Sequence, residues 1–202
     1  NIVTIHDFGE AGGMFYLRFT ANNISYGPDP DTTWGATMPA DSIIPGMKVY
    51  HGQPDADYGN DWTVDSASVV VDTFNTRAFT FNTLDYGWIS TGKALTGFNP
   101  ANVGITPQVN AERNETVDLA VYLLFPSINS VMNVDNIAGQ QTVTAYNVPV
   151  GMQAVAVAMG VGRITNKAYF GKTNVTITSS QNISFSVTQM TDQQIFDSLD
   201  NL

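Results

Sequence analysis

The stretch from Gln153 to Gly160, within YNVPVGMQAVAVAMGVGR at residues 146–163, constrains the fold more than any other part of the chain. Its side chains alternate between two sides, with larger apolar residues on one and alanines on the other: Val155, Val157 and Met159 against Ala154, Ala156 and Ala158. This pattern predicts a strand that is buried on both faces. The alanines would let a bulky layer, such as a facing sheet, approach closely. The preceding VPVG at residues 148–151 predicts a turn.

Period-two patterns fill residues 112–190 and predict six or seven short strands at the spacing of a β-sandwich. The residues expected to face the core are Val117, Leu119, Val121, Leu123, Phe125, Val143, Ala145, Val175, Ile177, Ile183, Phe185 and Val187. The segment 167–172 is expected to be a short strand of its own, followed by a hairpin. In that hairpin Asn182, Ser184 and Ser186 are expected to face water.

The first 110 residues are also β-like but less regular. Strands are expected at 2–6, 14–20, 47–50, 68–72 and 77–82. Long polar loops are expected at 26–46 and 51–62, and residues 96–108 are expected to cross over into the second half. At the other end of the chain, Asp192 as N-cap and Ile195, Phe196 and Leu199 on one face predict a short C-terminal helix.

These patterns predict an all-β fold with a β-sandwich and a short C-terminal helix. The expected division is an N-terminal β-rich lobe with long loops at 1–110, a β-sandwich at 111–191 and a C-terminal helix or tail at 192–202. The N-terminal lobe either forms its own sandwich or extends the second one. We favour two β lobes that share an interface.

The segment YNVPVGMQAVAVAMGVGRITNKAYFGKTNVTITSSQNISFSVTQMT resembles carboxypeptidase-regulatory-like (transthyretin-like) β-sandwich modules. The matching residues are Val148, Pro149, Gly151 and those of 154–158, and YFGK…VTIT…Q at 169–181 is similar to the version in bacterial surface lipoproteins. The resemblance covers about 112–190, without the longer charged surface loops of many such modules. It implies a Greek-key, transthyretin- or immunoglobulin-like sandwich that serves as a secreted or cell-surface accessory domain without catalytic residues.

Charge and composition exclude several classes of function. The formal net charge is −10 and the eight basic residues are scattered, which argues against nucleic acid and against anionic membrane surfaces as partners. The absence of cysteine excludes disulfides, cysteine-ligated metals and thiol catalysis. No apolar run is long enough for a transmembrane helix.

The expected location is secreted or on the cell surface, with a lipid anchor on a bacterial outer surface as one form. The low share of charged residues, 13%, is typical of secreted all-β proteins with a polar, uncharged surface. Because the sequence starts at Asn1, removal of an export signal or lipid-anchor leader is favoured over a trimmed chain. The oligomeric state stays open.

An acidic stretch, DADYGND at residues 55–61, predicts a calcium site through Asp55, Asp57 and Asp61. Calcium takes several hard oxygen ligands from a flexible loop. The EF-hand pattern fails, because Gly59 replaces the third acidic ligand and no glutamate follows. The alternative is an exposed acidic turn. Calcium is the one cofactor that the sequence indicates.

Aromatic residues in or beside the expected loops predict a glycan-binding surface: Trp34, Tyr50, Tyr58, Trp62, Tyr86 and Trp88. Their rings can stack on sugar rings while Asp and Asn side chains bind the hydroxyls. The alternative is that the rings cover the ends of the core. His6 and His51, the two histidines, are expected to be solvent-edge imidazoles and not zinc ligands.

The sequence therefore predicts a protein that is not an enzyme and that binds a glycan or a protein at the cell surface. A structural subunit of a surface appendage, offering strand edges to its neighbours, is the alternative. A glycan-active hydrolase is disfavoured, because the chain has three glutamates and no G-x-S-x-G, H-E-x-x-H or P-loop motif. No catalytic residue is predicted.

Overall fold

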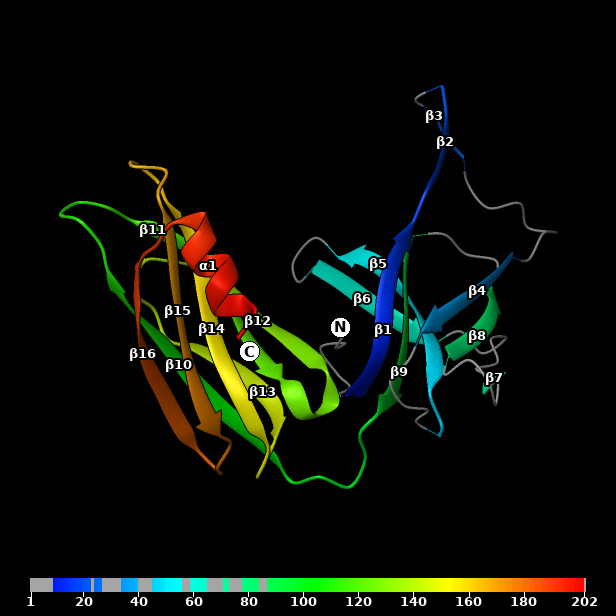
Figure 1. The fold of residues 1–202 in the computed structure, drawn as a ribbon. Coiled ribbons are helices and arrows are strands. Elements are labelled where there is room, and N and C mark those ends of the chain that lie inside the picture. The colour runs from blue at the N-terminus through cyan, green and yellow to red at the C-terminus, as the bar shows by residue number, and fades with distance from the viewer. Residues whose placement is uncertain are drawn as a thin grey trace. The chain divides into compact units, whose positions relative to one another are not determined.

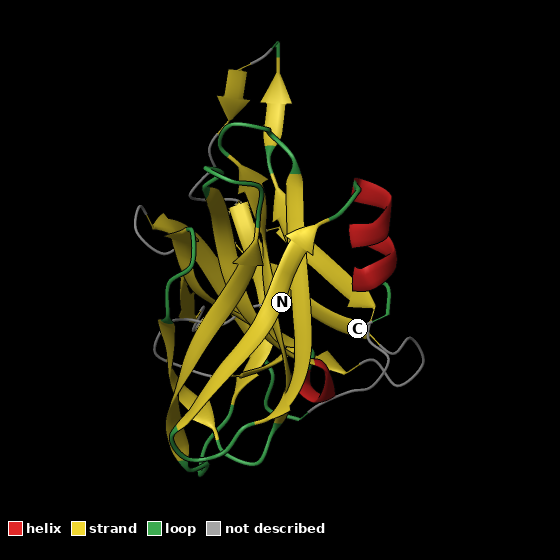
Figure 2. Cartoon of the chain, turned by 90° about the vertical axis from the view of Figure 1, so that its left-hand side faces the viewer, coloured by secondary structure: helices red, strands yellow, loops and turns green. Residues whose placement is uncertain are grey.

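The computed structural model describes residues 9–22, 24–26, 34–39, 45–55, 59–64, 71–72, 78–83 and 87–201. The fold is all-β, as predicted, and the described residues add only a short 3-10 helix, Pro126–Ile128, and the helix α1, Asp192–Leu199 (Figure 2). Neither of these helices has the length and apolar character needed to cross a membrane. Contacts divide the chain into two units, Asn1–Leu95 and Thr96–Leu202.

The N-terminal unit contains a four-stranded sheet, a three-stranded sheet and a small hairpin (Figure 1). The four-stranded sheet has the order β1 (Gly9–Leu17), β9 (Gly87–Ala94), β5 (Lys48–Asp55) and β6 (Gly59–Val64). The three-stranded sheet has the order β4 (Trp34–Pro39), β8 (Ala78–Thr83) and β7 (Val71–Asp72). The hairpin pairs β2 (Phe19–Ala21) with β3 (Ile24–Tyr26).

The two larger sheets of this unit share a hydrophobic core. Val49 of β5 and Ile89 of β9 pack with Met38 of β4 and Phe81 of β8, and all four side chains are buried. Alternation along each strand leaves the other side chains facing outward, as Tyr50 does between Val49 and His51. One face of the four-stranded sheet therefore lies in the core, and on the other face Val64 is exposed whereas Ser90 is buried.

Several expectations for the first 110 residues need correction. The strands expected at 14–20, 47–50, 68–72 and 77–82 correspond to β1 with β2, β5, β7 and β8, and the strand expected at 2–6 lies outside the described residues. The stretch 26–46, expected to be a loop, contains β4, and 51–62 forms the β5–β6 hairpin. Pro, Asp and Asn suppress the hydrophobic signal of these strands, although alternate positions such as Met38 still enter the core.

The C-terminal unit contains a seven-stranded sheet with the order β12-β11-β14-β15-β16-β10-β13 (Figure 1). Its strands are β10 (Pro100–Asn110), β11 (Val117–Phe125), β12 (Ser130–Ala138), β13 (Val143–Pro149), β14 (Gln153–Gly162), β15 (Ala168–Thr176) and β16 (Gln181–Gln189). Only β10 and β16 pair in parallel. β15 and β16 pair only at Tyr169–Gln189 and Phe170–Thr188, so β16 diverges from β15 beyond that point.

The period-two predictions in this unit are confirmed by the burial of the side chains. The predicted inward residues of β11, β13 and β16 are all buried, and Val175 of β15 is half-buried. Asn182, Ser184 and Ser186 are exposed, as expected. Residues 167–172 are not a separate strand, because β15 runs on without a break into the first arm of the hairpin.

β14 is buried on both faces, as its alternation predicts. Ala154, Ala156 and Ala158 are at most 3% exposed, and Val155 and Val157 at most 6%. The valine side is covered by α1 and not by a second sheet, because Val155, Val157 and Phe170 pack against Ile195 and Leu199 (Figure 1). The prediction of two-sided burial did not name the layer that covers the valine side.

The predicted C-terminal helix is confirmed, but its details differ. Thr191, and not Asp192, is the N-cap, in a capping box with Gln194. Phe196 was expected on the buried face but is 61% exposed. At the other end, Lys172 of β15 donates to the backbone oxygen of Ser198 at 2.5 Å, which places a cation at the negative end of the helix.

Residues 96–108 are not a crossover between lobes. They contain most of β10, which lies between β16 and β13, and Val103 and Ile105 point into the core. The contacts accordingly divide the chain between Leu95 and Thr96, earlier than the expected division between residues 110 and 111.

Replacing Ala156 with Leu is expected to lower the free energy of unfolding by about 1–3 kcal/mol, because a fully buried site must accept a larger side chain. Urea unfolding followed by circular dichroism measures this change. Asn174→Leu, at an exposed position of β15, is the matched control and should change the free energy by less than about 0.5 kcal/mol. Equal destabilisation by both substitutions would contradict the prediction.

Candidate functional site

One row of positions across the four-stranded sheet is rich in aromatic residues. Tyr16 of β1 pairs with Trp88 of β9, Trp88 pairs with Gly52 of β5, and Gly52 pairs with Trp62 of β6. Neighbouring strands in a sheet lie about 4.8 Å apart, so this register brings together residues that are far apart in sequence. The row lies on the face opposite to Ile89, which faces the core.

We call four described side chains on this outer side the aromatic face: Tyr16, Tyr50, Val64 and Trp88. Tyr16 is 52% exposed and Val64 is 47% exposed, while Tyr50 and Trp88 are half-buried. The rings of Tyr16 and Trp88 have their centroids 5.1 Å apart and are tilted by 57°. Tyr50 and Val64 pair across β5 and β6 in the next row. The face therefore presents accessible aromatic and aliphatic surface on a paired β scaffold.

Gly52 lies in the same row as Tyr16 and Trp88. It has no side chain, yet it is buried and is the register partner of Trp88. Aromatic side chains commonly cover glycines on a neighbouring strand. The register therefore places Trp88 where its ring can cover Gly52.

The aromatic residues predicted to bind glycan are only partly brought together. Tyr50 and Trp88 lie on the aromatic face, and Trp62 occupies a register position in the same row, although its side chain is outside the described part. Trp34 lies in β4 of the other sheet, where its backbone pairs with Thr83. Tyr58 and Tyr86 lie outside the described residues.

Tyr16 is a site residue that sequence reasoning missed. MFYLRFT was interpreted only as a strand, although its alternation places Tyr16 on one side and Leu17 on the other. The predicted aromatic residues were also expected in or beside loops, whereas Trp34, Tyr50, Trp62 and Trp88 are strand residues. A strand position holds a ring more rigidly than a loop position would.

Two of the predicted calcium ligands, Asp55 and Asp61, lie in the paired strands β5 and β6. Asp55 is the last residue of β5 and its backbone pairs with Gly59, while Asp61 of β6 pairs with Gln53. Asp57 lies outside the described residues. No group of three or more metal-ligating side chains occurs within the described ranges, and the calcium site stays a prediction because its central residues fall outside them.

His51 was expected at the solvent edge, and this expectation is wrong. It is 4% exposed, and alternation along β5 places it on the side of the sheet opposite to Tyr50. Its backbone carbonyl accepts a hydrogen bond from Thr63 Oγ1 at 3.4 Å. His6 lies outside the described residues.

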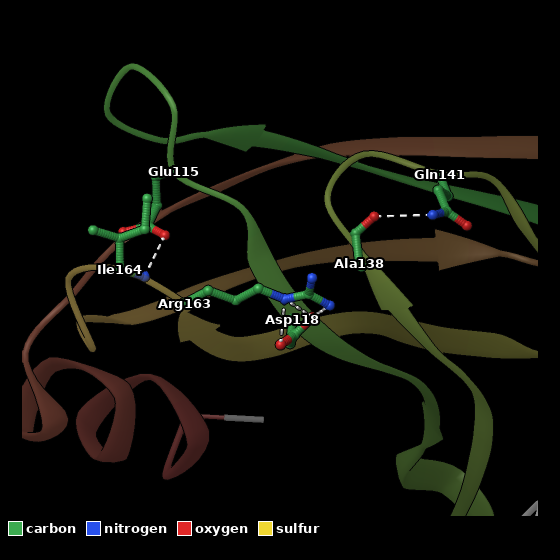
Figure 3. A network of polar contacts seen from close by, with 6 residues as sticks. All are labelled: Glu115, Asp118, Ala138, Gln141, Arg163 and Ile164. Carbon is green, nitrogen blue, oxygen red and sulfur yellow. Dashed lines mark hydrogen bonds and ion pairs between the residues drawn. The ribbon is translucent and has the colours of Figure 1, made fainter.

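Charged residues in the C-terminal unit gather where the segment before β11 meets the turn after β14 (Figure 3). Arg163 Nη2 lies 2.7 Å from Asp118 Oδ1, and the Arg163 guanidinium donates to both oxygens of that carboxylate. Lys167 Nζ lies 2.6 Å from Glu112 Oε1. The carboxylates and cations of this network therefore neutralise each other.

The side chain of Glu115 binds the backbone of the same turn. Its carboxylate accepts hydrogen bonds from the backbone N–H groups of Ile164 at 3.0 Å and Thr165 at 2.9 Å (Figure 3). Hydrogen bonding from Thr165 and Ile164 holds the pKa of Glu115 below its ordinary value. The hydrogen bond from Arg163, with its positive charge, likewise lowers the pKa of Asp118.

An open groove of about 640 Å³ lies over β12, β11 and β14, beside this network. Its lining is largely apolar or small, with Ala120, Met159 and Gly160 among its residues. Among the described residues that line the groove, the titratable ones are Asp118 and Arg163, which are paired with each other.

Comparison with known proteins identifies no relative: no family model matches the chain, and no curated protein or solved structure matches it.

Replacing Glu115 with Gln is expected to lower the thermal midpoint at neutral pH, because the backbone N–H groups of Ile164 and Thr165 lose a charged acceptor. The pKa of Glu115 is lower in the folded chain than its ordinary value of 4.5, so its stabilising effect is fully present above that value. The effect is lost as the pH falls through the lower folded pKa.

The measurement for Glu115→Gln is a series of thermal melts between neutral and acidic pH. The gap in midpoint between the native protein and the variant should be widest at neutral pH and should close in acid. Asp135→Asn on the edge strand β12 serves as the carboxylate control and should show a smaller gap. A gap that stays constant across the pH series would show that the carboxylate charge is not the cause.

Proposed function

We propose that the protein is a non-catalytic binding protein that holds a saccharide on the aromatic face of its N-terminal unit. The observation that supports this most directly is the exposed ring pair of Tyr16 and Trp88 on a four-stranded sheet. Sugars present one or both ring faces as C–H groups and carry hydroxyls around the edge. Exposed tyrosine and tryptophan suit that chemistry, because each has a large apolar ring and a polar tip.

The arrangement of the rings favours a single saccharide chain over a flat crystalline surface. A flat ligand would need coplanar rings, whereas Tyr16 and Trp88 are tilted by 57°. A single chain can twist to follow two tilted rings. The hydroxyl of Tyr16 can donate to or accept from sugar hydroxyls.

We favour binding over hydrolysis for a chemical reason. Glycoside hydrolysis generally uses two carboxyl groups that flank the scissile bond. Among the described side chains of the aromatic face there is no carboxylate.

We favour saccharide binding over the assembly of strand edges because both edges of the seven-stranded sheet are irregular. The register shifts between Ala101 and Val103 where β10 pairs with the edge strand β13. It shifts again between Val121 and Tyr122 where β11 pairs with the edge strand β12. β-bulges at an edge oppose the addition of another strand.

We also propose that the C-terminal unit is a Greek-key sandwich of the carboxypeptidase-regulatory-like kind and that the protein works outside the cell or on its surface. β15 and β16 pair at only two positions and then diverge. This divergence supports two layers, one with β12, β11, β14 and β15 and the other with β16, β10 and β13. The surface rich in uncharged polar residues supports the location. In this proposal the C-terminal unit supports the protein and the N-terminal unit binds.

Tyr16→Ala is expected to weaken saccharide binding by about two- to tenfold, the range that one aromatic contact contributes. A panel of soluble oligosaccharides, titrated by calorimetry against the native protein and the variant, measures the effect. Trp88→Ala should weaken binding at least as much. A melting curve of this variant tests whether Trp88 also stabilises the sheet next to its register partner Gly52.

Tyr146→Ala is the matched control, because Tyr146 is 63% exposed and lies on β13 of the other unit. It should leave binding unchanged. Failure of every saccharide in the panel to bind, or equal losses for Tyr16→Ala and Tyr146→Ala, would refute the proposed function.

A further inference from the structure

We infer that the saccharide on the aromatic face is an acidic one, whose carboxylate or sulfate lies against Lys48. This inference depends on the proposed function and adds the charge of the ligand. It concerns a residue that the glycan-binding prediction did not include.

Lys48 belongs to the same side of the sheet as the aromatic rings. It precedes Tyr50 by two positions in β5 and is exposed, whereas the intervening Val49 is fully buried in the core. Its register partner on β9 is Gly92, which has no side chain to screen the ammonium from that direction. A saccharide that crosses from Trp88 over Tyr50 therefore reaches Lys48 at the rim of the face.

The ammonium of Lys48 is available to a ligand. In the described part of the chain it makes no hydrogen bond or ion pair, and no carboxylate lies on the aromatic face. Three basic residues of the C-terminal unit differ in this respect, because Arg163 is paired with Asp118, Lys167 with Glu112, and Lys172 with the end of α1.

The negative net charge of the chain does not prevent an acidic saccharide from binding near Lys48. The formal net charge of −10 repels anions, but salt screens that repulsion beyond about 8 Å at physiological ionic strength. Among the described side chains on this side of the sheet, Lys48 is positively charged and none is negatively charged. An acidic saccharide therefore gains an ion pair at Lys48 that a neutral one lacks.

The test compares saccharides that differ only in charge. The probes are uronate-containing oligosaccharides, oligogalacturonate among them, each paired with the same oligomer after reduction of its carboxylates to alcohols. At low salt the native protein should bind the acidic member of a pair about two- to fivefold more tightly, the range expected for one exposed ion pair. The preference should shrink as salt is added.

Variants at Lys48 locate the effect. Lys48→Gln should abolish the preference for the acidic member while leaving affinity for the neutral member unchanged, and Lys48→Arg should keep the preference. Lys93→Gln is the control, because Lys93 alternates with Ile89 and Thr91 on the other side of β9. It should behave as the native protein does.

The outcomes separate this inference from the proposed function. Equal binding of both members of each pair, with losses for Tyr16→Ala, would overturn the acidic ligand and leave the saccharide site standing. A preference that survives in Lys48→Gln would also overturn the role of Lys48. Failure of all the pairs to bind would count against the proposed function and against this inference together.

Discussion

The two-sided burial of β14 is the constraint on which the C-terminal unit depends. The small alanine side leaves room for the larger inward residues of the same sheet, such as Leu123, which is the register partner of Ala156. The valine side supports α1, an eight-residue helix that would be marginal by itself in water. Val155 and Val157 pack against Ile195 and Leu199, and this apolar contact helps to hold α1 in place.

The fold of this unit was largely predictable because its strands alternate without interruption. In β16, Ile183, Phe185 and Val187 are buried and every residue between them is exposed. β10 escaped prediction because a proline inside a run argues against a strand. Pro107 is tolerated because β13 pairs with β10 only as far as Ile105, which leaves one side of the strand unpaired beyond that point.

The site was less predictable, because it depends on register between strands that are distant in sequence. Residue types alone indicated Trp88 and Tyr50 as candidates, but nothing in the sequence shows that Trp88 stands between Tyr16 and Gly52. Trp34 has the same chemistry and lies in another sheet. The polar composition of residues 26–46 and 51–62 also predicted loops. The strands there have few inward positions, and one of these holds the polar residue His51.

The two units differ in how they use their polar and aromatic side chains. In the C-terminal unit the charges at the turn after β14 satisfy one another, and Glu115 fixes the backbone beside them. Such a network stabilises a turn but leaves little free to recognise a ligand. In the N-terminal unit, Tyr16 is 52% exposed and lies beside Trp88, and Lys48 belongs to the same side of the sheet. Large apolar groups exposed together commonly mark interaction sites, and for that reason we place recognition in the N-terminal unit.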